Sequence, residues 1–409
     1  MANWLDNQKP RPCAFKSFGP SILAQQMRGK IRSIDVPADR FEARKLVRES
    51  CKVEPGVYGW LDENRQLAYV GKSKALQKRL LSYFAKNPSE NKVERLRTQC
   101  RHIVWEPISH ELLALIRETE LIHRWQPEFN SMGQPSRLRP AFVCIGGSPA
   151  PNARLVRKLS GNHLHAFGPI SGTKRLRRAV VSLNQVFNLR DCPDKTKFEF
   201  QDQQFLFDNQ TTAKCIRYEL GTCPGPCAGL CSSRDYHDLL DKMLEFLRGS
   251  SQRALQQIEL KMNNAAQRQA FETAAIHRDC LQNLQWLDRR LNGLSVAEKR
   301  LNGVLPIKAR RNRTAWLVLR GGRIVETMAI PKDPDKKLQL RKSILQIAAT
   351  QPPVATNLLE MSLQLIVISW FRKYPKLKQQ LIDFETLAQN FPESCDQSRQ
   401  ISQSLQWSA

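Results

Sequence analysis

Hydrophobic positions recur along residues 54–130 with two different periods. The runs GVYGWL (56–61) and LAYVG (67–71) are rich in β-branched and aromatic residues and flank the polar stretch DENRQ. This pattern predicts two short strands joined by a turn. A third run of the same kind, IVWEPI, follows at 103–108. Between the second and third strands the apolar residues change to helical spacing, which predicts two helices there.

A further amphipathic stretch ends this segment, and we expect it to be a helix capped by Ser109. Its buried stripe consists of Leu112, Leu115, Ile116 and Ile122. The expected order is therefore β-β-α-α-β-α, a small sheet with helices against it. Residues 1–53 precede it and contain one helical piece, ADRFEARKLVRES. We expect them to be an N-terminal extension without an activity of its own.

Helical periodicity dominates the chain from residue 235 onward. DYHDLLDKMLEFLRGS (235–250) predicts an amphipathic helix that Gly249 ends. Two further helical stretches meet at Phe271, and small alanines near the bend allow an antiparallel hairpin. TAWLVLR and RIVETMAI are joined by Gly321 and Gly322, which predicts a β-hairpin. Helical patterns continue to about residue 390, and the last residues are polar enough to be disordered. The fold class predicted is therefore a multidomain α/β (α+β) protein.

Charge narrows the class of partner. The chain has 409 residues, with 64 Lys plus Arg against 38 Asp plus Glu, a formal net charge of +26. Such an excess favours a polyanion, because binding to phosphates releases counterions. Basic runs at 137–139, 153–158, 174–178 and 308–313 point the same way. A membrane partner is not expected, because the longest apolar run, LIVISWF at 365–371, is far too short to span a bilayer.

Cysteine usage bears on the compartment. Eleven cysteines, an odd number, occur without a signal-peptide pattern at the start of the sequence. We therefore expect reduced thiols and a cytoplasmic location.

The segment 54–130 also contains the candidate chemistry. Three of the six tyrosines in the chain (Tyr58, Tyr69 and Tyr83) fall in it. They occur among the cations Lys72, Lys74, Lys78 and Arg79, with Glu118 downstream. Phosphodiester hydrolysis needs a base for the attacking water, charge relief on the phosphate and usually a metal. Phenols, cations and a carboxylate at this density therefore indicate chemistry at a phosphate.

These residues carry a resemblance to a known family. GVY at 56–58 and YVG at 69–71 resemble the two halves of the GIY-YIG nuclease signature. The stretches GKSKALQKRLLSYF (71–84) and ETELIHRWQPEFN (118–130) resemble the N-terminal nuclease of the UvrC excinuclease family. Lys72, Arg79, Tyr83, Glu118 and Asn130 stand at spacings similar to those of the family. Further on, HAFGPI and LNQVFNLRDC also resemble UvrC segments.

The expected roles follow from this chemistry. Glu118 is the candidate ligand of a divalent metal, Mg²⁺ or Mn²⁺, with waters filling the other positions. Tyr58 or Tyr69 is the candidate base, and the sequence does not choose between them. A phenol with an ordinary pKa near 10 needs cations to stabilise its phenolate, and Lys72 and Arg79 are placed to do so. Arg79 also suits the phosphate, while Tyr83 and Asn130 are expected to orient water and phosphate.

The cysteines predict a metal site. Cys215, Cys223, Cys227 and Cys231 follow the spacing C-x7-C-x3-C-x3-C, which differs from the C-x2-C pairs of zinc ribbons. The resemblance implies a [4Fe–4S] cluster. The expected ligands are Cys192, Cys215, Cys223 and Cys227. Cys231 is the alternative to Cys192, and zinc or free thiols are the alternatives to the cluster.

The helical hairpin resembles the UVR motif, through which UvrC contacts the damage-loading protein UvrB. The matching stretch is MNNAAQRQAFETAAIHRD at 262–279. Phe271 is the expected apolar anchor, with Glu272 and Arg278 as its charged neighbours.

The resemblance implies a DNA repair endonuclease that makes one incision, 3′ to a lesion, in damaged double-stranded DNA. The resemblance assigns damage recognition to UvrB, with UvrA upstream. The incision is expected to be single because the second, RNase H-like nuclease of full-length UvrC has no counterpart here. The alternatives are a non-catalytic adaptor for DNA and UvrB, or a GIY-YIG nuclease of recombination or mobile elements. The expected domains are 1–53 (extension), 54–132 (nuclease), 133–234 (basic linker and Cys-rich region), 235–295 (UVR-type region), 296–395 (C-terminal α+β domain) and 396–409 (disordered tail).

Overall fold

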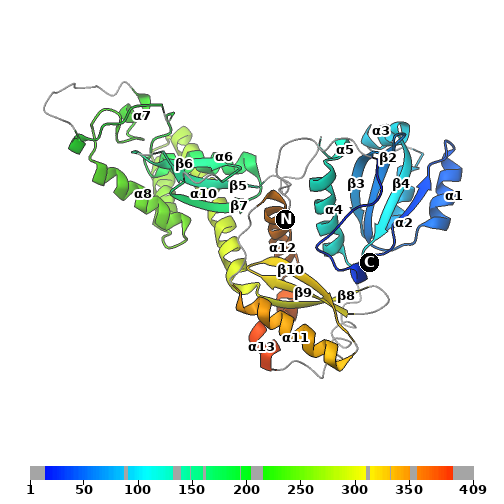
Figure 1. The fold of residues 1–409 in the computed structure, drawn as a ribbon. Coiled ribbons are helices and arrows are strands. Elements are labelled where there is room, and N and C mark those ends of the chain that lie inside the picture. The colour runs from blue at the N-terminus through cyan, green and yellow to red at the C-terminus, as the bar shows by residue number, and fades with distance from the viewer. Residues whose placement is uncertain are drawn as a thin grey trace. The chain divides into compact units, whose positions relative to one another are not determined.

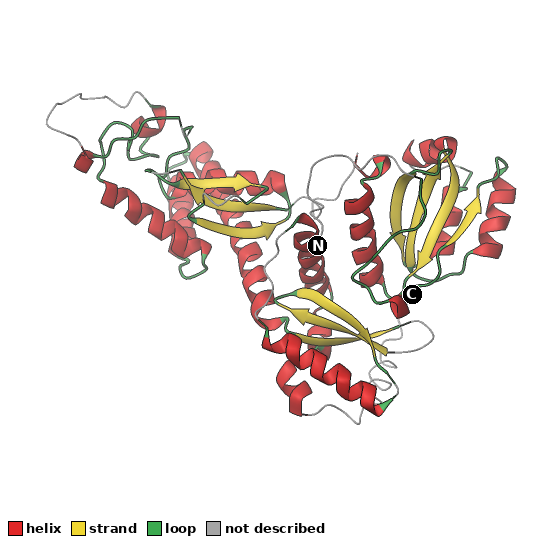
Figure 2. Cartoon of the chain, viewed as in Figure 1, coloured by secondary structure: helices red, strands yellow, loops and turns green. Residues whose placement is uncertain are grey.

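The computed structural model describes most of the chain, in two compact units. The described residues are 14–86, 91–131, 140–147, 149–159, 163–193, 195–203, 215–309, 314–331, 333–350 and 357–389. The predicted tail at 396–409 and the basic run at 137–139 lie outside them. One unit contains residues 1–138 and 297–409, and the other contains residues 139–296. Each unit is described by itself below (Figures 1 and 2).

The first unit contains a four-stranded antiparallel sheet in the order β1-β4-β2-β3. The strands are β1 (Arg32–Asp35), β2 (Gly56–Asp62), β3 (Leu67–Ser73) and β4 (Cys100–Pro107). The helices of this part are η1 (Gln25–Met27), α1 (Arg40–Ser50), α2 (Leu76–Tyr83), α3 (Asn91–Gln99), α4 (Glu111–Trp125) and α5 (Glu128–Ser131). The order β2-β3-α2-α3-β4-α4 confirms the β-β-α-α-β-α expectation.

The start of α4 differs from the expectation. The N-cap is His110, whose Nδ1 accepts the backbone N–H of Leu112 at 3.1 Å, and not Ser109. An imidazole nitrogen can accept this bond as a hydroxyl does, and Ser109 stands one residue too early for its oxygen to reach the second helical N–H.

The segment predicted as an N-terminal extension contributes a strand and core residues to this unit. β1 pairs with β4 in the register Ile34 to Ile103. Phe18, Leu23 and Met27 are buried in the same hydrophobic cluster as residues of β2 and α4. Residues 14–35 therefore complete the sheet and its core.

A second sheet in this unit has the order β10-β9-β8. Its strands are β8 (Gly303–Lys308), β9 (Thr314–Arg320) and β10 (Arg323–Ala329). Gly321 and Gly322 both have positive φ and join β9 to β10, which confirms the predicted hairpin. The helices are α11 (Pro334–Ala349), α12 (Leu358–Lys373), η5 (Pro375–Gln380) and α13 (Phe384–Gln389).

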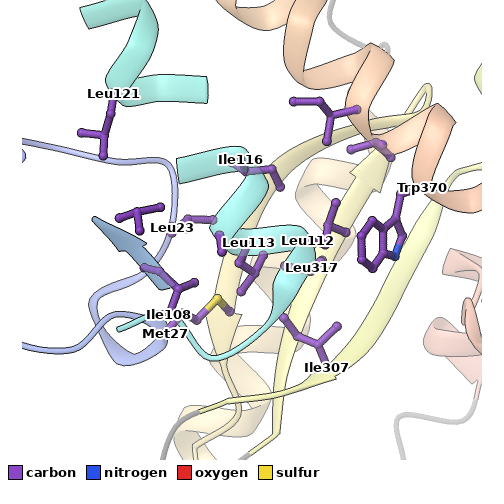
Figure 3. Packing of buried hydrophobic residues seen from close by; sticks show 14 of the residues in the cluster. Leu23, Met27, Ile108, Leu112, Leu113, Ile116, Leu121, Ile307, Leu317 and Trp370 are labelled. Carbon is purple, nitrogen blue, oxygen red and sulfur yellow. The ribbon is translucent and has the colours of Figure 1, made fainter. Parts of the chain in front are cut away.

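The two faces of this sheet bury different neighbours. Trp316 and Val318 of β9 pack with Ile344 of α11 and Leu387 of α13. Leu317 and Leu319, which point to the other face, belong to the cluster that contains residues of α4 and α12. Figure 3 shows this shared core, where Leu112, Ile116, Leu317 and Trp370 come from α4, β9 and α12. The C-terminal sheet therefore packs against helix α4 through a continuous hydrophobic core.

The second unit contains a three-stranded antiparallel sheet in the order β6-β5-β7. Its strands are β5 (Ala141–Gly146), β6 (Asn152–Val156) and β7 (His165–Ile170). The helices are α6 (Thr173–Val186), η3 (Gln201–Gln203), α7 (Ile216–Glu219), α8 (Ser233–Leu247), α9 (Arg253–Gln267) and α10 (Phe271–Arg300). The helix predicted over 235–250 is α8, and the predicted hairpin is α9 with α10.

Among the helices of the described ranges, none combines the length and the apolar character needed to cross a bilayer.

Two half-buried histidines, of α4 and its cap, predict an acid-sensitive contact between α4 and α12. Burial lowers the pKa of both His110 and His123 to about 4. The ring of His110 packs against Trp370, with centroids 5.8 Å apart, and His123 Nε2 lies 3.3 Å from Ser362 Oγ. Protonation of His110 would compete with the helix N–H that its Nδ1 accepts. Neutral imidazole is therefore the form that this interface stabilises.

We expect the first unit to lose stability as the pH falls from about 6.5 toward 4. The folded pKa lies below the unfolded value, so the unfolded chain binds more protons in this window, and the loss is on the order of 3 kcal/mol for each histidine. Thermal unfolding at several pH values measures it. His110→Asn keeps a capping side chain without the titration, so its melting temperature should fall less than that of the wild type. His237→Asn, at an exposed position of α8, is the control. Equal falls in all three proteins would contradict the assignment.

Candidate functional site

The β2–β3 hairpin and α2 bring the predicted tyrosines and Arg79 together. Tyr58 Oη and Tyr83 Oη lie 2.8 Å apart, and Arg79 donates from Nε to Tyr58 Oη at 3.1 Å. Arg79 also donates from Nη2 to Tyr83 Oη at 3.4 Å. The ring of Tyr69 packs edge-on against that of Tyr58, with centroids 6.0 Å apart. One guanidinium is therefore held by two phenols, with a third phenol beside them.

The glycine of the YVG segment makes this arrangement possible. Gly71 lies opposite Tyr58 in the β2–β3 register. A Cβ at residue 71 would stand 2.6 Å from Tyr58 Oη, closer than non-bonded atoms approach. Glycine at this position therefore leaves room for the phenol of Tyr58, whose Oη accepts a hydrogen bond from Arg79.

Burial makes the phenols weaker acids. Desolvation raises the pKa of Tyr58, Tyr69 and Tyr83, and neighbouring phenols raise it further, while Arg79 lowers it by a smaller amount. The sequence-based expectation that nearby cations favour the phenolate is therefore met for Arg79 in direction, but burial outweighs it. At neutral pH all three phenols therefore keep their protons in this structure.

Glu118 is held on α4 facing the end of β3. Its Oε1 accepts the backbone N–H of Lys72 at 3.0 Å, and its charge raises the pKa of Tyr69. The carboxylate is half-buried, which leaves part of it open to water. Among the residues that the structure describes, no three His, Cys, Asp or Glu side chains gather at a metal site. A single oriented carboxylate fits a hard cation such as Mg²⁺, which is commonly bound through one or two carboxylates and several waters.

The ammonium of Lys72 does not face the tyrosines. Lys72 Nζ pairs with Glu111 Oε1 at 3.3 Å, and Lys74 Nζ pairs with Glu111 Oε2 at 3.0 Å. Burial disfavours the charge of Glu111, but these two lysines hold its pKa below the ordinary value. Lys72 therefore donates its backbone N–H to Glu118, while the ammonium group of Lys72 is held by Glu111.

The side chain of Asn130 binds strand β3. Its Oδ1 accepts the N–H of Val70 at 2.7 Å, and its Nδ2 donates to the carbonyl of Val70 at 2.9 Å. Both polar atoms of the amide are thus engaged with one backbone residue between Tyr69 and Gly71. This geometry gives Asn130 a part in holding β3 in place.

Two residues of the site are not evident from the sequence pattern. Glu111 anchors both lysines, and Lys92 of α3 places its Nζ 4.0 Å from the centroid of the Tyr69 ring. For Glu111 the available signal was its spacing of seven residues from Glu118, which puts both carboxylates on one face of a helix. Lys92 carried no such signal, because its neighbour comes from another element.

In the cysteine-rich stretch, as elsewhere among the described residues, no three His, Cys, Asp or Glu side chains form a group that could hold a metal ion. Cys192, Cys215, Cys223 and Cys227 are half-buried, and Cys231 is buried. Burial raises the pKa of Cys223, Cys227 and Cys231, and charges of neighbouring cysteines raise it further. The iron–sulfur assignment stays a prediction, as does the choice between Cys192 and Cys231.

The helical hairpin exposes its predicted anchor. Phe271 begins α10 with 69% of its surface exposed, and Glu272 and Arg278 are also exposed. Arg278 pairs with the carboxylate of Asp279 at 2.9 Å. A groove of about 320 Å³ lies beside the bend, lined by Lys261, Asn264, Ala265, Arg268, Ala270, Thr273 and His277. A large apolar side chain with charged neighbours at a bend is typical of a protein contact.

Three family models match successive segments of the chain. Residues 54–131 match the UvrC-like GIY-YIG domain, residues 142–246 match the UvrC/Cho excinuclease middle domain, and residues 252–285 match the UvrB/uvrC motif.

Curated relatives cover the same part of the chain. UvrABC system protein C of Bartonella henselae is 30% identical over 249 residues, which are 60% of this chain and 36% of that protein. The protein of that name from Salmonella schwarzengrund is 31% identical over 251 residues, 61% of this chain and 39% of the relative. The chain thus spans less than two fifths of the length of these relatives.

Solved structures resemble the first matched segment. The GIY-YIG N-terminal endonuclease domain of UvrC from Thermotoga maritima, bound to its catalytic divalent cation magnesium, is 31% identical. The match covers 21% of this chain and 97% of that domain, with a TM-score of 0.19.

Proposed function

We propose that this chain, which belongs to the UvrC family over residues 54–285, is a repair endonuclease. It would hydrolyse one phosphodiester bond of damaged double-stranded DNA, 3′ to the lesion, in nucleotide excision repair in the cytoplasm. The observation that carries the proposal is the cluster in which Arg79 binds Tyr58 and Tyr83 beside the carboxylate of Glu118. The net charge of +26 supports a nucleic-acid substrate.

The side chains of Arg79 and Glu118 suit the negative charge that builds up on the phosphate during hydrolysis. Arg79 presents a planar cation to the phosphate, and its two phenol partners fix its orientation. Glu118 would hold a divalent cation, Mg²⁺ or Mn²⁺, which relieves charge on the phosphate when bound. The N–H of Lys72 fixes one carboxylate oxygen of Glu118, so the ligand is oriented before a cation binds.

The base would be Tyr58 or Tyr69, the two phenols on the paired strands. Either phenol needs its pKa lowered before it can accept a proton from water, because burial raises both. A cation at Glu118 would act in that direction. The pH profiles of Tyr58→Phe and Tyr69→Phe distinguish them. The variant without the base should lose the ionisation that the wild-type rate shows.

The partner would be UvrB, with UvrA upstream, and the contact would use Phe271, Glu272 and Arg278 at the hairpin. Phe271→Ala should weaken UvrB binding at least tenfold, since truncation of a central aromatic residue costs about 2 kcal/mol or more. Ile216→Ala, an equally exposed position on α7, should leave binding unchanged. Calorimetric titration with UvrB measures both. Similar affinities for the two variants would argue against the hairpin contact.

An iron–sulfur cluster would be bound by Cys192, Cys215, Cys223 and Cys227. Cys231 is the alternative to Cys192. Its support is the sequence spacing of the thiols, and no catalytic step depends on it. Protein purified without oxygen should absorb near about 400 nm and contain iron and sulfide if the cluster is present. Zinc without this absorbance would support the alternative.

The test of the function is incision of a duplex that carries one lesion and a label at either end. With UvrA, UvrB and Mg²⁺ we expect a single cut on the 3′ side of the lesion, and no cut when UvrB or Mg²⁺ is omitted. A missing cut would favour the adaptor. A cut at the same rate without UvrB and without a lesion would favour a nuclease of recombination.

A further inference from the structure

A basic segment follows directly on helix α12. Residues 372–378 read RKYPKLK, and Arg372, Lys373, Lys376 and Lys378 carry its four cations. No carboxylate occurs from Arg372 to Gln380. The segment covers the end of α12 and most of η5. It lies beyond the three segments that the family models match, so none of them assigns it a role.

This basic segment is anchored to helix α4 of the nuclease segment. Trp370 packs its ring against that of His110, which caps α4, and against Tyr374 at a centroid distance of 4.6 Å. Lys373 Nζ lies 5.0 Å from the centroid of the Tyr374 ring. Leu377 and Tyr374 are partly buried against the shared core. The cations therefore stand on a surface whose position relative to α4 is set by packing.

The segment also lies close to the candidate active site. Lys74 pairs with Glu111, and its pKa is raised first by that carboxylate and in smaller part by Tyr374. This ion pair holds Lys74 at the first turn of α4, next to the capping residue His110, which the ring of Trp370 contacts. Glu111 and Glu118 are seven residues apart on α4, which corresponds to about 10 Å along the helix. That distance is about three nucleotide steps of a DNA strand at about 3.4 Å each.

We propose that residues 372–378, together with Lys74, bind the phosphate backbone of the DNA duplex that enters the active site. The C-terminal α+β domain would then extend the DNA-binding surface of the nuclease beyond the scissile phosphate. The continuity of the cations with the Glu118 site favours DNA over an acidic protein as the occupant. The inference rests on the proposed function for the nature of the substrate, and it adds a domain to which no nucleic-acid contact is assigned.

The test replaces Lys373, Lys376 and Lys378 together by glutamine and measures binding of a fluorescent DNA duplex at several salt concentrations. Each lost phosphate contact reduces the steepness of the negative slope of log K against log salt by about 0.9, so we expect the slope to become less negative by about 2.7 and the affinity to fall by about tenfold or more. The matched control replaces Lys336, Lys337 and Lys342 of α11 by glutamine. Because α11 packs on the opposite face of the sheet, this variant removes the same charge elsewhere and should bind nearly as the wild type does.

A gain of affinity provides a second arm that misfolding cannot imitate. Gln379→Lys adds a cation at an exposed position of η5, and we expect it to tighten DNA binding by about twofold or more. Equal losses in the two triple variants would overturn the proposal, because net charge alone would then explain them. The proposal would also be overturned if the variant that lacks Lys373, Lys376 and Lys378 bound DNA as the wild type does but lost the binding of an acidic protein. Binding is measured without cleavage, so failure of the incision assay leaves this test intact.

Discussion

Glu118→Gln is expected to reduce DNA incision by about 1,000-fold or more while the protein stays folded. Charge relief by a metal contributes several kcal/mol to phosphodiester cleavage, and each 1.36 kcal/mol is a tenfold change in rate. An amide is a much poorer ligand than a carboxylate for a hard cation. Its carbonyl oxygen can still accept the N–H of Lys72, which Glu118 binds at 3.0 Å. Single-turnover incision at saturating Mg²⁺ measures the loss.

Glu42→Gln is the matched control for this variant. Glu42 is an exposed residue of α1 in the same unit, so its replacement removes the same charge outside the site. Unchanged melting temperatures of both variants would show that folding is intact. A Glu118→Gln protein that cuts at the wild-type rate would remove the metal-ligand role, and with it the proposed nuclease mechanism.

Arg117→Met is expected to lower the free energy of unfolding of the first unit by about 3–5 kcal/mol, because it leaves the buried carboxylate of Glu120 without its cationic partner and that of Glu106 with Arg28 alone. Arg117 is fully buried and donates to Glu106 Oε2 and Glu120 Oε2, both at 2.9 Å. It also donates to the carbonyls of Gly19 and Pro20 at 2.8 Å. The same side chain thus neutralises two buried charges and ties the N-terminal segment to α4. Urea unfolding followed by tryptophan fluorescence measures the change.

Two further variants separate the loss of the ion pairs from loss of packing. Arg117→Met combined with Glu120→Gln should recover part of the stability, since Glu120 then carries no unpaired charge and Glu106 keeps its ion pair with Arg28 at 3.1 Å. Arg101→Met removes the exposed pair with Glu63 and should change the free energy by less than about 1 kcal/mol. If Arg117→Met costs no more than Arg101→Met, the buried network does not stabilise the fold.

The sequence predicted which residues form the site better than it predicted their interactions. Tyr58, Arg79 and Tyr83 are brought together because a strand and the next helix place them close to one another in a local β-β-α unit. The ammonium of Lys72 was expected near the phenols, but Glu111 holds it. That pair joins a strand to a helix 39 residues away, and periodicity within either element says nothing about it.

The less predictable parts of the fold depend on long-range pairing. β1 falls in the segment expected to be an extension because four residues carry little signal, yet its pairing with β4 completes the nuclease sheet. β5 to β7 lie in the region expected to be a basic linker. These strands are short and flanked by cations, so the alternation of apolar and polar residues that predicts a strand was not evident there. Hairpins such as β9 and β10 were predicted correctly, since the turn residues and both strands are contiguous.

The sequence by itself determined the local elements and the identity of the candidate catalytic groups, because strand and helix periods and motif spacing are properties of short segments. Only the tertiary structure decided the protonation of those groups and the place of the C-terminal domain. Desolvation of Tyr58 depends on every residue that covers it, and Arg79 offsets it only in part. The packing of α12 on α4 likewise depends on side chains far apart in the chain, such as His123 and Ser362, which are 239 residues apart. Burial and long-range contact are properties of the assembled core, and no single segment encodes them.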